Sequence, residues 1–325
     1  KTMAREQSYT LPEFIERYLF YLTTSGRQLS TVRRYRYDLI EVHRYMTDVD
    51  QPLETIDDFK AISIETWKTF INEYLIEEKL YQQATVARIV TVINQVNYQI
   101  RQTKAKLIEY AQPTHELTAK HVASFKEYEQ LVRTNQSDRG LTEHQLKARP
   151  YLIDRNELIL RLFYRYGLRV HHIIGLKMHD LNFAQQEMTV HDRLGNRYLL
   201  HLEREDQDIM LRYLKTIPEP VRPRYNSTDP FFVAFDFARM TFRWVYSKNA
   251  PKQLSIVMIT KMMRQLNERS DNKRILTPSM LRNSFILKTY QDEMTKEERL
   301  QKTCLYKDVS LRRYEEAVEE LTPLL

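Results

Sequence analysis

The chain has 325 residues, more than the roughly 100 to 200 of one typical domain, so we expect two domains. Its 50 lysines and arginines outnumber 43 aspartates and glutamates, and the net charge of +7 favours a polyanionic partner. A single cysteine, Cys304, excludes an intramolecular disulfide and predicts a reducing compartment. The sequence has neither an apolar run of roughly 18 residues nor the apolar core of a signal peptide, which predicts a cytoplasmic protein without a membrane partner.

The low content of glycine (5) and proline (11) predicts a mainly helical chain with a small β component. The N-terminal part has the apolar spacing of a four-helix bundle. The first helix starts near Pro12 and ends at Ser25-Gly26, and the second is capped by Ser30 or Thr31. The third and fourth cover Ile62–Glu78 and Gln83–Gln102.

Arginines interleaved with tyrosines surround the second predicted helix. This mixture suits contacts with phosphates and sugars, whereas a basic helix face is often only solvated surface. The sequence leaves both interpretations open. The arginines concerned are Arg27, Arg33, Arg34, Arg36 and Arg44.

The segment Ala111–Thr114 is the predicted linker, which gives domains 1–112 and 113–325. In the second domain, apolar alternation about Leu194-Gly195-Asn196 predicts a β-hairpin, and a polar segment at 135–150 predicts a surface loop. Residues 218–230 form a predicted proline-rich loop. Residues 206–214 form one further segment, and the expected helices are 121–133, 154–165, 171–176, 231–245, 255–269, 277–290, 296–305 and 310–321.

Two motifs and the first helices resemble the tyrosine recombinases, the phage-integrase type of DNA strand-exchange protein. Tyr166-Gly167-Leu168-Arg169 is similar to the family's first catalytic box, and the segment 277–285 around Arg282 is similar to the second. Tyr314 lies near the position of the family's nucleophile. The resemblance implies a helical, SAM-like core-binding domain and a C-terminal catalytic-like domain that together clamp duplex DNA without a cofactor. It also implies a bacterial host and association with the nucleoid.

Compared position by position, the residues that hold a phosphate are kept and those that move protons are replaced. Arg169, Arg282 and Tyr314 match the family's arginines and nucleophile. Arg193 stands where the hairpin lysine is expected, and an arginine does not readily release a proton. The other replacements are Ser279 and Asn283 at histidine positions, Leu305 at a histidine or tryptophan position, and His171-His172 at the acidic position.

We therefore expect a catalytically inactive relative in which these site residues are vestigial. We expect it to act as a transcriptional repressor of phage or prophage origin that maintains lysogeny. The pattern is similar to that of the master repressors of SPβ-type prophages. The alternatives are a working recombinase in which Ser279 or Asn283 positions a water molecule, and a scaffold that no longer binds DNA. The inducer, whether a protein or a small molecule, is not specified by the sequence. The expected contacts with double-stranded DNA are Arg33, Arg34, Arg36, Arg169, Arg193 and Arg282.

Two further expectations concern metals and assembly. His171 and His172 lie near Asp180, but adjacent histidines on a short helix point to different faces, so no metal site is predicted. The C-terminal helix is amphipathic and can either pack within its own chain or join a second copy in a homo-oligomer.

Overall fold

The computed structural model describes residues 9–113 and 116–325, which fold as two compact units that divide between residues 115 and 116. The sequence predicts this boundary after residue 112. Thr114 of the predicted linker and the N-terminal residues 1–8, used above to argue against a signal peptide, lie outside the described residues. None of the described helices is both long enough and apolar enough to cross a membrane.

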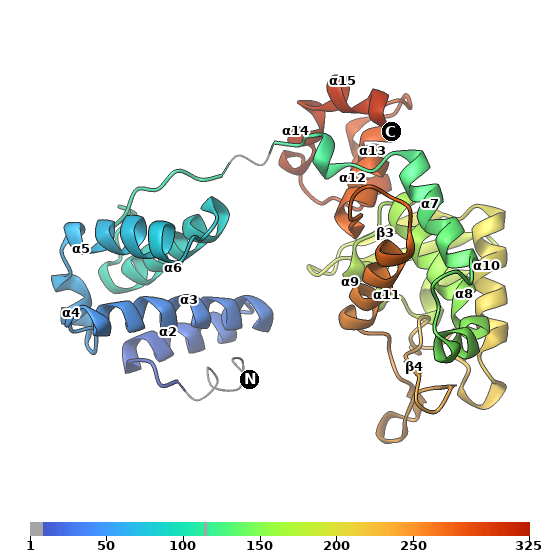
Figure 1. The fold of residues 1–325 in the computed structure, drawn as a ribbon, viewed down its shortest axis with the longest axis horizontal. Coiled ribbons are helices and arrows are strands. Elements are labelled where there is room, and N and C mark those ends of the chain that lie inside the picture. Colours follow the sequence, from blue (N-terminus) through green and yellow to red (C-terminus); the bar gives the residue numbers. More distant parts are fainter. Residues whose placement is uncertain (1–8, 114–115) are drawn as a thin grey trace. The chain divides into compact units, whose positions relative to one another are not determined.

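The first unit is helical throughout its regular structure (Figure 1). Its core combines aliphatic side chains with an aromatic group in which Trp67 and Phe70 are completely buried and meet edge to face with ring centroids 6.2 Å apart. The elements are α2 (Glu13–Thr24), α3 (Leu29–Asp48), α4 (Ile56–Ala61), α5 (Ile64–Thr69), the π-helix η1 (Phe70–Glu78) and α6 (Gln83–Arg101).

Three details of this unit differ from the sequence prediction. α3 begins at Leu29 after Gln28, which makes no side-chain cap, so neither Ser30 nor Thr31 is the first residue outside the helix. The short helix α4 was not predicted, although Thr55 and Asp58 form a capping box at its start. The predicted third helix is divided into α5 and a π-helical continuation.

The second unit is built around the long helix α8, which contacts α7, α10 and α12 (Figure 1). Its helices are α7 (Phe125–Gln136), α8 (Glu143–Tyr164), α9 (Val170–Gly175), α10 (Arg204–Thr216), α11 (Ile256–Arg269), α12 (Pro278–Lys288), α13 (Lys296–Thr303), α14 (Val309–Glu315) and α15 (Val318–Leu321). Single 3-10 turns occur at η2 (Ala119–His121), η3 (Met178–Asp180), η4 (Glu219–Val221), η5 (Tyr246–Lys248) and η6 (Thr322–Leu324).

The strands are short and antiparallel. The predicted hairpin is confirmed, with Met188 opposite Leu200 and Val190 opposite Tyr198, and these four side chains are buried on one face. The strands are β1 (Leu181–Asn182), β2 (Glu187–His191) and β3 (Arg197–His201) in one sheet, then the pairs β4 (Phe235–Asp236) with β5 (Thr241–Phe242) and β6 (Trp244–Val245) with β7 (Ala250–Pro251). The mainly helical fold with a small β component is thus confirmed.

Two predictions for the second unit are wrong. Most of the predicted surface loop at 135–150 is helical, because α8 starts at a capping box between Thr142 and Gln145 and continues through Pro150. The predicted helix 231–245 is instead a buried apolar run followed by short hairpins. In addition, the predicted helix 310–321 is interrupted between α14 and α15.

Candidate functional site

The turn before Arg169 depends on a glycine. Gly167 has φ of +60°, a left-handed conformation that costs glycine little, and it lets the chain reverse after α8. The backbone N–H of Leu168 then donates to the Leu162 carbonyl at 2.9 Å. Arg169 directly precedes α9, and its backbone N–H donates to His172 Nδ1 at 3.2 Å. This turn leaves the Arg169 side chain half-buried.

Arg282 is held in a cradle of backbone carbonyls. Thr277 caps α12 by accepting from the N–H of Met280, which places Arg282 in the second turn with only 5% of its surface exposed. Its Nη1 donates to the Gly167 carbonyl and its Nη2 to the Thr303 carbonyl at 2.8 Å. The guanidinium therefore joins the turn before Arg169 to the end of α13.

The two arginines are close enough to repel one another. Burial, and secondly the charge of Arg169, lower the pKa of Arg282 to about 10, so it remains protonated at neutral pH. Within residues 9–113 and 116–325 no carboxylate forms an ion pair with either guanidinium. The site thus carries positive charge that the surrounding protein does not neutralise.

Two neutral histidines adjoin these arginines. Burial, followed by the charges of Arg193, Arg169 and Arg282, lowers the pKa of His171 to about 4. Burial, His171 and the arginines lower the pKa of His172 to about 2. The structure therefore brings the three predicted arginines of the second unit into one electrostatic neighbourhood, and neither imidazole adds a charge to it at neutral pH.

His171 and His172 stand where the sequence comparison expects an acid, and the more buried of the two is His172. Its Nδ1 accepts a backbone N–H, so the neutral ring carries its proton on Nε2, which is buried without a hydrogen-bond partner among the described residues. A carboxylate here would neutralise one guanidinium. Histidine instead leaves both positive charges available and adds an N–H donor.

Asp192 lies near enough to this group to act on the pKa of both histidines, and the hairpin turn occupies both of its oxygens. Oδ1 accepts the N–H groups of Leu194 and Asn196 at 2.8 and 2.9 Å. Oδ2 accepts from the Asn196 amide at 2.7 Å and from the Tyr198 hydroxyl at 3.2 Å. This turn presents Arg193 exposed at the tip of the β2–β3 hairpin.

Tyr314 lies on α14 with its ring almost fully buried. Its hydroxyl donates to Asn283 Oδ1 at 2.8 Å, and Asn283 Nδ2 donates to the His121 carbonyl at 2.8 Å. Tyr314 is also close enough to Arg282 to raise the pKa of that guanidinium. The predicted tyrosine and the second arginine are therefore neighbours, as their sequence spacing suggests.

The remaining replaced positions offer no proton-transfer group. Ser279 is exposed in the first turn of α12. Leu305 is buried in a small apolar cluster with Phe285, Leu311 and Tyr314. Burial raises the pKa of the neighbouring Cys304 thiol to about 12, so that thiol stays protonated.

In the first unit the predicted arginines fall into two groups. Arg33 and Arg34 are exposed on α3. Arg36 instead makes a bidentate ion pair with Glu16, at 2.6 and 2.7 Å, and donates to the Tyr9 carbonyl at 2.9 Å. Its guanidinium thus joins α2 to α3 and has fewer donors left for a phosphate.

Sequence reasoning could not identify several contributors to this site. The carbonyls of Gly167 and Thr303 belong to the backbone, and the partner of His172 Nδ1 is a backbone N–H, so no side-chain pattern marks them. The Asp192-x-x-Gly-Asn turn is a detectable signal, because Asp commonly accepts backbone N–H groups in turns. No three His, Cys, Asp or Glu side chains gather as a metal site in the described parts of the chain.

The fold of the chain matches that of solved recombinases and integrases. XerH recombinase bound to difH substrate in a pre-cleavage complex superposes with a TM-score of 0.61 at 14% identity, covering 90% of this chain and 79% of that one. The chain has the tyrosine recombinase fold. A lambda integrase dimer bound to a COC′ core site gives a TM-score of 0.60 at 14% identity, covering 94% and 95% of the two chains.

Sequence similarity agrees with the tyrosine recombinase fold. No family model matches the chain. The tyrosine recombinase XerD of Staphylococcus aureus is 24% identical over 283 residues, covering 83% of this chain and 82% of that protein. XerD of Staphylococcus saprophyticus is 24% identical over 277 residues with the same coverage. Sequence and fold together support a relationship to the tyrosine recombinase and integrase family.

Proposed function

We propose that this protein binds double-stranded DNA sequence-specifically as a phage or prophage transcriptional repressor, and that it has lost strand exchange. The observation that carries the proposal is a pair of guanidinium groups, Arg169 and Arg282, that lack any carboxylate partner among the described residues, while the family's proton-transfer residues are replaced at the neighbouring positions Ser279, Asn283 and Leu305. Relatives of the same fold are recombinases and integrases solved with DNA.

The retained arginines suit phosphate binding. A guanidinium has five N–H donors in a planar fork that matches phosphate oxygens. The carbonyl cradle fixes the orientation of Arg282 before any ligand arrives, and the half-buried Arg169 lies close enough to add its charge. The exposed Arg33 and Arg34 on α3 add charge in the first unit. Each contact of this kind would contribute affinity that falls as salt increases.

The lost groups are those that strand cleavage requires. Attack by a tyrosine on a phosphodiester needs a proton acceptor for the phenol and a proton donor for the departing 5′ oxygen. Ser279, Asn283 and Leu305 are poor substitutes for such groups, and Arg193 holds its proton too tightly. Each general acid or base contributes roughly 10²- to 10⁴-fold in rate, so the combined loss leaves negligible cleavage.

The decisive experiment combines trapping and binding. Duplex DNA with a nick beside the scissile position traps a covalent protein–DNA adduct only with an active enzyme, because the freed fragment diffuses away. We expect no adduct but salt-sensitive gel shifts on operator fragments obtained by genome-wide mapping of bound DNA. Mapping to several promoters fits a repressor, whereas a single attachment site and a trapped adduct would contradict the proposal. No binding at all would favour a scaffold.

One observation favours the alternative of an active recombinase with an atypical site. The Tyr314 hydroxyl is hydrogen-bonded 2.8 Å from Asn283, next to Arg282, so a nucleophile is in place. For the repressor, Tyr314→Phe removes one hydrogen bond, costs about 1 kcal/mol of stability and leaves DNA binding unchanged. Loss of a DNA-rearranging activity in this variant, with an unchanged gel shift, would establish the enzyme instead. Tyr306→Phe, at an exposed position, is the matched control.

We also propose that a homo-oligomer forms on DNA through the last helices. In the structure these helices pack within their own unit, with Leu311 and Leu321 completely buried beside Phe285. Exchange with a second copy would require these side chains to leave one apolar cluster and enter an identical one. Light scattering with and without operator DNA tests this, and Leu321→Ala should weaken assembly.

A further inference from the structure

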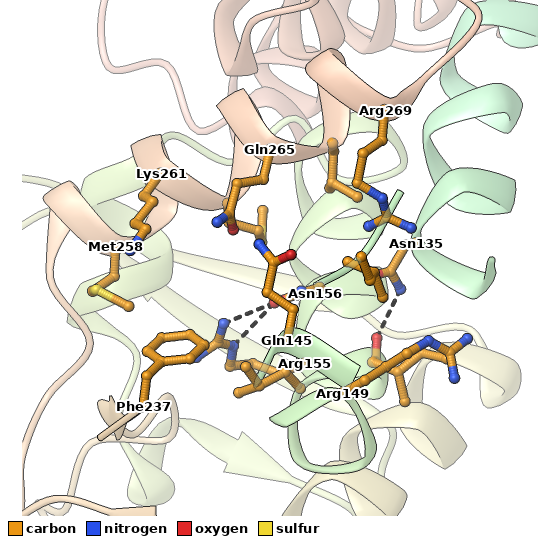
Figure 2. A pocket seen from close by; sticks show the side chains of 15 residues that line it. Asn135, Gln145, Arg149, Arg155, Asn156, Phe237, Met258, Lys261, Gln265 and Arg269 are labelled. Carbon is orange, nitrogen blue, oxygen red and sulfur yellow. Dashed lines mark hydrogen bonds between the residues drawn. The ribbon is translucent and has the colours of Figure 1, made fainter. Parts of the chain in front are cut away.

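A pocket on the second unit contains a buried and unpaired charge. Neither Arg169 nor Arg282 lines this pocket. It lies between α8, α11 and the turn that follows β4 (Figure 2). Arg155 of α8 is 3% exposed, and its Nε and Nη2 donate to Asn156 Oδ1 at 3.2 and 2.8 Å. Its Nη1 is buried with no hydrogen-bond partner among the described residues.

No nearby carboxylate balances this guanidinium. Asp154, one residue earlier, accepts instead from Arg212 at 3.1 and 3.2 Å, and Asp138 lies beside Arg149. Burial lowers the pKa of Arg155, and the nearby Tyr213 hydroxyl partly opposes this effect. Proteins normally pair a buried charge because an isolated one is costly. Arg155 therefore marks a position where a negative charge is missing.

The rest of the pocket supplies hydrogen-bond donors and no acid. Among its described lining residues are three further cations, Arg149, Lys261 and Arg269, and no Asp or Glu. Gln145 uses its Oε1 to accept the Thr142 N–H at 2.8 Å, which leaves its NH₂ group to donate elsewhere. Water could satisfy Arg155 Nη1 but would not neutralise the charge, whereas an oxyanion does both.

The size and the apolar walls define the ligand class. The cavity volume is about 70 Å³ and the pocket is open to solvent, so it suits a small ligand whose charged head group enters the pocket and whose body lies toward its mouth. Phe237, Met258 and Leu152 line the same space, and Figure 2 shows Phe237 and Met258 on the side opposite Asn135. Lys261 lies above the Phe237 ring at 5.6 Å. An apolar body would contact these side chains.

We propose that this pocket binds a small organic anion, with a carboxylate or phosphate head on Arg155 and a short apolar body against Phe237 and Met258. The site is independent of the proposed repressor function and of the Arg169 and Arg282 pair. Two sources of the head group, carboxylic acids and phosphate esters, share this chemistry.

Calorimetric titration of the full chain tests the proposal with phenylacetate and phenyl phosphate as probes and neutral 2-phenylethanol as the comparison. We expect at least one anion to bind with one-to-one stoichiometry and the alcohol not to bind. Binding of phenylacetate alone assigns a carboxylate ligand, and binding of phenyl phosphate alone assigns a phosphate ester. Arg155→Met should weaken binding on the order of 10- to 100-fold, the usual effect of a charge-assisted hydrogen bond.

Three variants make the result specific. Arg264→Gln removes an exposed charge from α11 that pairs with Glu268 and does not line the pocket, so it should bind like the wild type. Arg169→Ala should also bind normally, which separates this pocket from the arginine site. Lys261→Met, at an exposed position, should weaken binding several-fold and keeps the test valid if Arg155→Met does not fold.

The melting temperature supplies an independent readout. Because Arg155→Met removes an uncompensated buried charge, we expect its melting temperature to be unchanged or higher. The proposal is overturned if neither anion binds, if the alcohol binds equally well, or if both Arg155→Met and Lys261→Met bind like the wild type. A DNA-binding salt slope that falls by about one in Arg155→Met would assign Arg155 to a DNA phosphate and would also overturn it.

Discussion

Gly167→Ala is the most informative single change, because it affects the fold and the arginine site through one methyl group. A Cβ at this position would lie 2.9 Å from Phe285 Cε1 and closer still to Cδ1. The backbone φ of +60° is also unfavourable for alanine by about 1–2 kcal/mol. Displacing a packed ring costs a further 1–3 kcal/mol or so. We therefore expect Gly167→Ala to destabilise the second unit by about 2–5 kcal/mol.

The matched control is Gly195→Ala in the β2–β3 turn. Gly195 also has a positive φ, of +87°, but an added Cβ there meets no atom within 4 Å. It should therefore show only the backbone penalty. Urea unfolding followed by circular dichroism measures both variants, and hydrogen exchange of α8 and α12 amides locates the effect in the second unit. DNA affinity should fall in Gly167→Ala alone, because its carbonyl orients Arg282.

A double-mutant cycle with Phe285→Leu completes this test. The smaller side chain should make room for the alanine methyl. The loss of unfolding free energy in the double variant should therefore be about 1–2 kcal/mol smaller than the summed losses of the two single variants. Equal destabilisation by Gly167→Ala and Gly195→Ala, or a cycle without coupling, would refute the packing argument.

Two further predictions concern charge. Arg36→Gln should destabilise the first unit by about 1 kcal/mol, because a half-exposed ion pair with Glu16 is lost. Arg33→Gln should leave stability unchanged and reduce the salt slope of DNA binding by about one. Folding lowers the pKa of His172 from 6.5 to about 2, so the unfolded chain takes up a proton that the folded chain excludes as pH falls. Stability from this residue is complete above pH 6.5 and should fall by about 2 kcal/mol by pH 5, as measured by urea unfolding.

Each of these predictions has its own control. A larger loss of salt dependence in Arg36→Gln than in Arg33→Gln would show that Arg36 contacts DNA after all. His172→Gln cannot titrate, so its stability should vary less between pH 7 and pH 5 than that of the wild type. Parallel pH profiles for the two proteins would show that the imidazole is not responsible.

The sequence predicts those features that repeat along the chain or follow a motif. Apolar periodicity locates most helices, and alternation about Gly195 locates the hairpin and its register. The prediction from sequence fails where one local signal outweighs another. Pro150 suggests a break, yet the Thr142–Gln145 capping box starts a helix that tolerates it, because its apolar face packs on three neighbouring helices. Residues 231–245 are apolar enough for a helix, and only tertiary pairing decides otherwise.

The site was predictable to a similar degree. Motif spacing identifies Arg169, Arg282 and Tyr314, and the structure places them together. Motif spacing does not indicate which arginines already form ion pairs within the protein. Arg36 pairs with Glu16, which lies 20 residues earlier in the sequence, and no local pattern predicts this contact. Arg155 was overlooked because a charged residue on a helix is normally exposed, and its burial follows from three-dimensional packing alone.

The apolar cluster around Tyr314 links the two ends of the second unit. Leu117 and Val122, where this unit begins, share it with Leu311 and Leu321 of its last helices. The Ser284 hydroxyl adds a bridge from α12 to the backbone of Ala123. Release of the last helices would therefore expose apolar surface on the segment that follows residue 115. Release of the helices and detachment of that segment are thus thermodynamically coupled. Any partner that captures these helices would loosen the first segment of this unit, and any force that detaches that segment would favour release of the helices.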